Sequence, residues 1–386
     1  MHEITLSCSV ITPMFMAGAD GRTPEIRPSE FKGMMRWWWR AIKAEDDIDK
    51  LREEENKIFG GTENAGKSKV QLKVELENSS TSNNVSSEIN NYNGLKYLYY
   101  STFTLKSRGQ PIIREYFADN TKFKITLTSF DQHSFKNAVA SLWLAIYLGG
   151  FGTRARRGGG NIEVLDVECE QNNTINFICQ AENRNDLKKF LEDNINAIKS
   201  ICRPENGTEE YTNLIGAKIL IFDPYEDWKG ALDFLGGNYM KFRRELRRDK
   251  SVQDLSAFGM PIIFSLSGFK RRLVPYDLKN GKKRLSERWA SPVIFKVIKS
   301  KNNKYFPVVI SLKPGGVKFF GEEKKEKKKE NRKVEKTEEI KRDKLNEEKK
   351  ESWKVEKEKI EKINTNILND FLEFLKKERK WEELNI

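Results

Sequence analysis

The order of periodic segments in the first 170 residues constrains the fold most strongly. Residues 3–12 (EITLSCSVIT) alternate polar and apolar side chains, which is typical of a strand with one buried face. The predicted order is strand 3–12, helix 29–43 with Ser29 as its N-cap, strand 70–76, strand 121–130, a helix that Ser134 opens and Gly149 ends, and strand 162–168. This order predicts a ferredoxin-like (RRM-like) α+β unit, with helices on one face of the sheet.

Residues 171–386 predict a second, less regular unit of the same kind. The expected elements are a helix at 185–200, a strand at 217–222, a helix at 227–249, a strand at 261–266, and a hairpin of strands 292–299 and 306–313. Residues 321–362 alternate Lys and Glu, which is typical of a solvated helix or a disordered tether. We therefore expect two ferredoxin-like domains with insertions, 1–170 and 171–386, the second including the segment 321–362 and a C-terminal amphipathic helix.

Charge and residue counts limit the classes of function. The chain has 386 residues and a net charge of +13, which favours a polyanionic partner such as nucleic acid or an acidic membrane surface. Four scattered cysteines and two histidines make a zinc site or a disulfide framework an unfavourable interpretation. The N-terminus lacks signal-peptide features and no apolar run could cross a bilayer, so a cytoplasmic location is expected.

The segment FKGMMRWWWR (31–40) places three tryptophans in one predicted helix. At 3.6 residues per turn, Trp38 falls on a core face with Phe31 and Met35. Trp37 and Trp39 fall on the flanks of that face. Either they are packing residues, or they form an aromatic platform on which bases of single-stranded nucleic acid could stack. Lys32, Arg36, Arg40 and Lys43 form a basic stripe on the opposite side of the helix.

A glycine-rich loop, LGGFGTRARRGGGN (148–161), joins the second predicted helix to the fourth strand. Its glycines would let backbone N–H groups approach a ligand closely, and Arg154, Arg156 and Arg157 would supply donors for phosphate. We expect these arginines to contribute to binding more than to stability. The loop matches neither a P-loop nor a dinucleotide-binding fingerprint, and a plain flexible surface loop is the alternative.

A third basic segment, KFRRELRRDK (241–250), lies in the predicted helix of the second unit. Helical spacing places Lys241, Arg244 and Arg248 on one face, and Arg243 and Arg247 on another. The alternative is a solvated face that Glu245 and Asp249 partly neutralise.

These motifs together resemble the RAMP superfamily of CRISPR proteins, and within it RAMP subunits of the type III-B (Cmr) effector complex. The resemblance rests on the glycine-rich loop and on six quoted segments: TPMFMAGADG (12–21), PSEFKGMMRWWWRAI (28–42), IFGG (58–61), ALDFLGG (231–237), KFRREL (241–246) and ERWASPVIFKV (287–297). It implies a non-catalytic subunit without a cofactor. Its implied partners are the 3′ region of the guide RNA, the matching target RNA and other RAMP subunits.

Candidate RNA contacts follow from the three basic segments and from the Asp20–Arg22 loop that the resemblance implies. They are Arg22, Lys32, Arg36, Trp39, Arg40, Lys43, Gly152, Arg154, Arg156, Arg157, Gly158, Gly159, Lys241, Arg244 and Arg248.

Two other functions remain open at this stage. A RAMP endoribonuclease would need a general acid–base or a cluster of carboxylates. Asp20 lies where such an enzyme could place a catalytic aspartate, although Ala-Asp-Gly is also an ordinary turn sequence. The third possibility is a protein-interaction scaffold whose basic charge is incidental.

Overall fold

The first sheet joins four antiparallel strands in the order β2-β7-β1-β8. In this computed structural model, the described residues are 1–62, 66–83, 85–103, 106–107, 110–111, 114–169, 174–248, 252–266, 269–279, 282–285, 288–316, 318–325, 354–355 and 361–386. The strands are β1 (His2–Val10), β2 (Val70–Asn78), β7 (Lys122–Ser129) and β8 (Ile162–Cys169), with helices α1 (Pro28–Lys43) and α5 (Gln132–Tyr147) between them. This is the split βαβ arrangement that the sequence predicts.

Both helices of this unit begin slightly earlier than predicted. Pro28 occupies the first turn of α1 and Arg27 precedes it, so Ser29 is inside the helix and does not cap it. A proline at this position costs nothing, because its missing N–H would have no helical partner. Helix α5 is capped by Asp131, whose carboxylate accepts a hydrogen bond from the backbone N–H of Ser134 at 2.7 Å.

The second sheet repeats the same arrangement in the order β13-β14-β9-β18. Its elements are β9 (Asn213–Phe222), α7 (Trp228–Arg248), β13 (Val293–Lys299), β14 (Tyr305–Lys313), α8 (Asn366–Lys376) and β18 (Trp381–Asn385). The sequence patterns did not predict β18. The predicted strand at 261–266 forms β10 (Ile262–Leu266), which belongs to a separate sheet with β11 (Phe269–Lys279), β15 (Lys318–Lys325) and β16 (Lys354–Val355). Most of the segment 321–362 lies outside the described residues.

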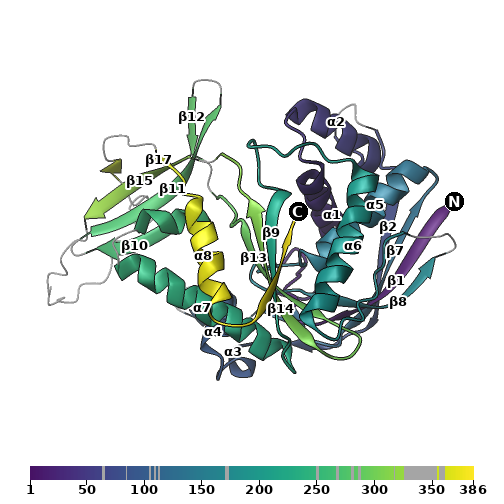
Figure 1. Ribbon diagram of the computed structural model, residues 1–386, viewed down its shortest axis with the longest axis horizontal. Helices are drawn as coiled ribbons and strands as arrows, with labels where there is room; N and C mark the ends of the chain where they lie inside the picture. Colours follow the sequence, from purple (N-terminus) through teal and green to yellow (C-terminus); the bar gives the residue numbers. More distant parts are fainter. Residues whose placement is uncertain are drawn as a thin grey trace, which may run out of the picture.

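The two main sheets share one core. Helices α1, α5 and α6 (Arg184–Cys202) lie between them, and α7, α8 and α4 (Asn93–Phe103) cover the far face of the second sheet (Figure 1). The second sheet is therefore buried on both faces. That explains why its strands read as nearly continuous apolar runs, such as VIFKVIK in β13.

Two segments of the first unit form helices although their sequences have no clear apolar periodicity. The charged residues 45–68 contain helix α2 (Ile48–Phe59), which Asp47 caps. The Ser/Asn-rich segment after β2 contains β3 (Thr81–Ser82) and α3 (Val85–Glu88), and α4 follows it. The remaining short elements are β4 (Lys106–Ser107), β5 (Gln110–Pro111), β6 (Tyr116–Phe117), the 3₁₀ helix η2 (Val252–Phe258), β12 (Lys282–Leu285) and β17 (Glu361–Lys362).

The glycine-rich loop lies along the outer edge of β13, the edge strand of the second sheet. The backbone N–H of Phe295 donates to the Arg156 carbonyl at 3.2 Å, and that of Val297 donates to Asn161 Oδ1 at 2.6 Å. From β13, the buried Lys296 ammonium donates to the carbonyls of Ile146 and Gly149 (2.8 Å for Gly149), at the end of α5. These contacts pair backbone groups that would otherwise be left open at a sheet edge.

A second contact between the units is a close crossing of α4 and α7 at glycines. A Cβ added to Gly94 would lie 2.2 Å from the carbonyl oxygen of Asp233 and 2.2 Å from the backbone nitrogen of Gly237. The Asp233 carboxylate of α7 accepts a hydrogen bond from the backbone N–H of Gly94 at 2.7 Å, so it caps α4. A Cβ on Gly237, in contrast, would meet nothing within 4 Å.

Gly94→Ala should destabilise the protein by about 1–3 kcal/mol, because backbone atoms must move apart to admit the methyl group. Gly237→Ala is the matched control. It adds the same methyl group to a helix in open space and should stabilise the protein by about 0.5–1 kcal/mol. Chemical denaturation measures both changes, and a shift of the same sign in the two variants would contradict the observed crossing.

Burial lowers the pKa of Lys296 to about 7, against 10.5 for an ordinary lysine. Between these values the unfolded chain binds more protons at this lysine than the native chain does. The free energy of unfolding should therefore rise with pH above about 7 on account of this group. Lys296→Met, which is similar in length and does not titrate, should lack this contribution.

The quantity to measure is the difference in unfolding free energy between wild type and Lys296→Met from pH 6 to 8.5. It should change in favour of wild type by on the order of 1 kcal/mol per pH unit above pH 7. Taking this difference cancels the opposite effect of the buried cysteines, whose pKa values burial raises. A difference that stays constant over this range would show that Lys296 does not titrate there.

Candidate nucleic-acid interface

The three tryptophans of α1 differ in their surroundings. Trp38 is fully buried, as predicted. Trp39 is also buried, with 2% of its surface exposed, and its Nε1 donates to Asn137 Oδ1 of α5 at 3.0 Å. The predicted flank position of Trp39 is therefore wrong, and the ring offers no surface to a base. Trp37 is half-buried and lies under the Arg156 guanidinium, 4.8 Å from the ring centre.

The basic stripe of α1 is partly neutralised by two carboxylates of α2. Arg36 Nε lies 2.5 Å and Arg40 Nη1 2.7 Å from the same Glu55 carboxylate oxygen, and Lys43 Nζ lies 3.1 Å from Glu54. Arg36 and Arg40 share one carboxylate and keep 30% and 35% of their side-chain surfaces exposed, so their contact with RNA stays a prediction, whereas Lys43 is buried. Burial lowers the pKa of Lys32, the remaining member, with a smaller effect from Arg36.

The glycines of the loop serve packing more than ligand approach. Gly158 has φ +80°, and an added Cβ would lie 2.4 Å from Leu232 Cδ2 of α7. Gly158 and Gly159 are buried, and a Cβ on Gly159 would lie 2.9 Å from the Thr153 carbonyl oxygen. The prediction that Gly158 and Gly159 let backbone N–H groups approach a ligand is thus wrong. Gly152, with φ +80°, is half-buried and lines a cavity.

The three loop arginines divide into two roles. Arg156 donates to the Ser291 carbonyl, and Arg157 Nη1 donates to the Val293 carbonyl at 2.9 Å, so both fasten the loop to the start of β13. These contacts give Arg156 and Arg157 a structural role, and their contribution to binding stays a prediction. Arg154 lies with its guanidinium 4.6 Å from the ring centre of Tyr100. Its Nε and Nη2 are buried without a hydrogen-bond acceptor among the described residues.

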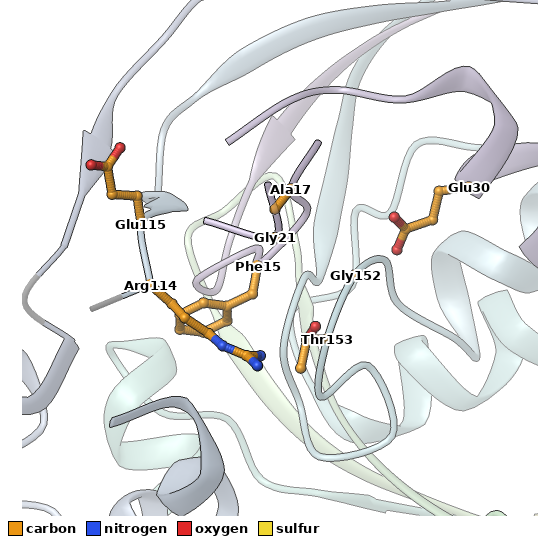
Figure 2. A pocket seen from close by; sticks show the side chains of 8 residues that line it. All are labelled: Phe15, Ala17, Gly21, Glu30, Arg114, Glu115, Gly152 and Thr153. Carbon is orange, nitrogen blue, oxygen red and sulfur yellow. The ribbon is translucent and has the colours of Figure 1, made fainter. Parts of the chain in front are cut away.

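A cavity of about 440 Å³ opens beside the loop (Figure 2). It is lined by Phe15, Ala17, Gly21, Glu30, Arg114, Glu115, Gly152 and Thr153. The Arg114 guanidinium points toward Thr153, and Glu30 lies on the other side of Gly152 (Figure 2). Burial raises the pKa of Glu30, although the Gly152 N–H opposes the shift. Because its lining includes two carboxylates and one guanidinium, this cavity is electrostatically mixed.

Four guanidinium groups gather on the α7 side of the loop, in an arginine–tyrosine cluster that comprises Arg154, Arg157, Arg243, Arg247, Tyr97, Tyr100 and Tyr239. Arg157 and Arg243 lie over the Tyr239 ring at 5.2 and 5.3 Å from its centre. Arg157, Arg243 and Arg247 all act electrostatically on Tyr97. None of the four arginines forms an ion pair with a carboxylate in the part of the chain that the structure describes.

Sequence reasoning missed most of this cluster. The tyrosines at 97 and 100 lie on α4, which was not assigned, and Arg243 and Arg247 were placed on the second face of their helix. In the run YLYY (97–100), Tyr97 and Tyr100 are three residues apart. On a helix this spacing places them on one face, so it could have indicated an aromatic surface.

The predicted face of α7 lies elsewhere. Lys241 Nζ lies 2.9 Å from a carboxylate oxygen of Glu378, while Arg244 and Arg248 are exposed. These three residues thus lie on a different face of α7 from Arg243 and Arg247. The face with Arg243 and Arg247 is the one beside the glycine-rich loop.

The loop after β1 is closed by its own aspartate. The Asp20 carboxylate accepts hydrogen bonds from the backbone N–H of Arg22 at 2.9 Å and from the Thr23 hydroxyl at 2.5 Å. These bonds lower the pKa of Asp20. The Arg22 side chain is exposed.

Among the described residues, no three His, Cys, Asp or Glu side chains come close enough to hold a metal ion. A search of the helices in the same residues finds none that is long and apolar enough to cross a membrane.

Comparisons with known proteins agree with this architecture. The family model described as the RAMP superfamily matches residues 7–163. The CRISPR system Cmr subunit Cmr1-2 of Pyrococcus furiosus is 38% identical over 182 residues, covering 42% of this chain and 96% of that protein.

Two solved structures share the fold. The apo crystal structure of Cmr1 from Pyrococcus furiosus superposes with a TM-score of 0.64 and 23% identity, covering 99% of this chain and 98% of that one. A chain of the type III-B Cmr-beta complex, solved by cryo-electron microscopy with cognate target RNA, AMPPnP and single-stranded DNA, gives a TM-score of 0.54 at 14% identity, covering 81% of this chain and 94% of that one. The chain belongs to the RAMP superfamily and, within it, to the Cmr1 subunits of the type III-B CRISPR (Cmr) complex.

Proposed function

We propose that this chain is a non-catalytic RNA-binding subunit of a type III-B Cmr effector complex. In that assembly it contacts the 3′ region of the guide RNA, the matching target RNA and neighbouring RAMP subunits, in the cytoplasm. The RNA-bound Cmr-beta structure, one chain of which shares this fold, supports the assignment. The net charge of +13 supports a polyanionic ligand.

The observation that carries the proposal is the arginine–tyrosine cluster beside the glycine-rich loop. Two donors of Arg154, Nε and Nη2, are buried without an acceptor in the part of the chain that the structure describes, and burial lowers the pKa of this guanidinium. Both facts mean that an anion placed beside it would be stabilising. Arg247 adds an exposed charge on α7. On the other side of the loop, Arg114 lines the cavity, and the exposed Arg22 follows Gly21, which also lines it. A phosphate backbone that passes over the loop would meet these four guanidinium groups.

The absence of catalysis is part of the same proposal. The Asp20 carboxylate is engaged by its own loop. The His2 ring stacks on Phe135 at 5.6 Å, and His133 lies beside Asn137 on α5, at the far end of that helix from the loop. These positions favour structural roles for the residues that an RNase would need.

We also propose the division into two ferredoxin-like domains, 1–170 and 171–386. It is supported by the repeated strand order of the two main sheets. RNA contact by Lys32, Arg22, Arg244 and Arg248 belongs to the proposal as well, because all four side chains retain access to solvent.

The double variant Arg154→Gln/Arg247→Gln should weaken binding of single-stranded RNA. It should also reduce the steepness of the log–log salt dependence by about 1.4, since each phosphate contact on a single strand contributes about 0.7. The measurement is a titration of labelled RNA with the full chain at several salt concentrations, alongside a thermal melt of each variant.

Lys69→Gln/Lys136→Gln is the matched control, because it removes the same charge at the opposite end of α5, where Lys69 lies near the Asp131 cap. An equal loss of affinity and slope in the control would mean that net charge alone governs binding. Recovery of intact RNA after incubation with Mg²⁺ or Mn²⁺ would distinguish a binding subunit from an endoribonuclease.

A further inference from the structure

Helix α4 is an insertion of the first unit that is held firmly on the second. Its first turn is capped by the Asp233 carboxylate, which accepts from the backbone N–H groups of Gly94 at 2.7 Å and Leu95 at 3.2 Å. The crossing at Gly94 and Gly236 brings the two helix backbones into direct contact. The side chains of α4 are therefore presented from a fixed position.

Two tyrosines on one face of α4 differ in exposure. Tyr97 packs edge-on against Tyr239 of α7, with ring centres 5.9 Å apart, and is half-buried. Tyr100, one turn later, keeps 55% of its surface exposed. An exposed aromatic ring near a packed aromatic pair is an arrangement on which a further planar group can stack.

The charges around these tyrosines suit a nucleic-acid backbone. Arg154 lies over Tyr100, and Arg243 Nη1 donates to the Tyr239 hydroxyl at 3.2 Å. Arg247 lies one turn beyond Arg243 and is exposed. Stacked bases and neighbouring phosphates together require this combination of an aromatic surface with several cations.

The face that receives the ligand is shared by both units: Tyr100 and Arg154 come from the first, and Arg243 and Arg247 from the second. In a duplex, each base is already paired and stacked within the helix, so it cannot stack on a tyrosine. Only an unpaired base can do so.

We propose that Tyr100 is a stacking site for one unpaired RNA base, whose adjacent phosphates lie on Arg154 and Arg247. The site does not read the identity of the base, because every base has an aromatic face. It distinguishes single-stranded from duplex RNA. The inference rests on the proposed RNA-binding function and assigns to it a particular residue and a particular state of the RNA.

The test compares Tyr100→Ala, Tyr100→Phe and Phe130→Ala in the full chain, with a single-stranded and a duplex RNA of equal length. Phe130 is the matched control, an aromatic side chain that is 84% exposed and lies beside the Asp131 cap of α5. Tyr100→Ala should lower the affinity for single-stranded RNA by about 5- to 150-fold, as alanine replacement of a stacking aromatic does. Tyr100→Phe and Phe130→Ala should retain most of it.

Two further readouts make the outcome specific. Affinity for duplex RNA should be unchanged in Tyr100→Ala, and a 4-thiouridine placed in the single strand should crosslink to the peptide that contains residues 93–103. Unchanged single-strand affinity in Tyr100→Ala, together with a loss in Arg154→Gln/Arg247→Gln, would overturn the stacking site but leave the proposed function intact.

Absence of any salt-sensitive RNA binding by wild type would overturn the proposed function and the stacking site together. Competition by polyglutamate as effective as by RNA of equal charge would also overturn the stacking site, since it would assign the cluster to acidic peptide. Thermal melts identify any variant that fails to fold, and for such a variant the crosslink in wild-type protein decides.

Discussion

The pairing of the glycine-rich loop with the open edge of β13 is the interaction on which the rest of this structure depends. A loop that is buried without belonging to a sheet must find partners for its backbone groups, and an edge strand has the same need. Here the loop and the edge strand supply these partners to each other. The Phe295 N–H donates to the Arg156 carbonyl, and the Val297 N–H donates to Asn161 Oδ1. Lys296 then ties the end of α5 to the same strand. The first unit therefore supplies the hydrogen-bond partners that the edge of the second sheet lacks.

This pairing also explains why the candidate interface combines both units. Because Arg156 and Arg157 are engaged by β13, Arg154 is the loop arginine whose guanidinium turns to α4. Helix α4 can be there only because Gly94 and Gly236 allow its backbone to meet that of α7. A cluster of cations and tyrosines assembled from an insertion, a loop and a helix is a consequence of packing, and no single segment encodes it.

The sequence predicted the first sheet, its two helices and most elements of the second sheet, because alternation and helical spacing report burial on one face. It failed where a second surface covers a residue. Trp39 was placed on a flank, since a projection cannot show that α5 covers that side as well as the sheet. The basic stripe of α1 looked open, because the charged residues 45–68 gave no reason to place Glu54 and Glu55 opposite it. Tyr100 was missed because α4 follows a Ser/Asn-rich segment.

Amide hydrogen exchange at Phe295 and Val297 tests the central claim most directly, namely that the loop seals the edge of β13 and joins the two units. These amides should exchange only through global unfolding, with the same denaturant dependence as the central strands β9 and β14. Fast exchange of both amides that is independent of denaturant, while β9 and β14 stay protected, would show a free sheet edge and would contradict the account.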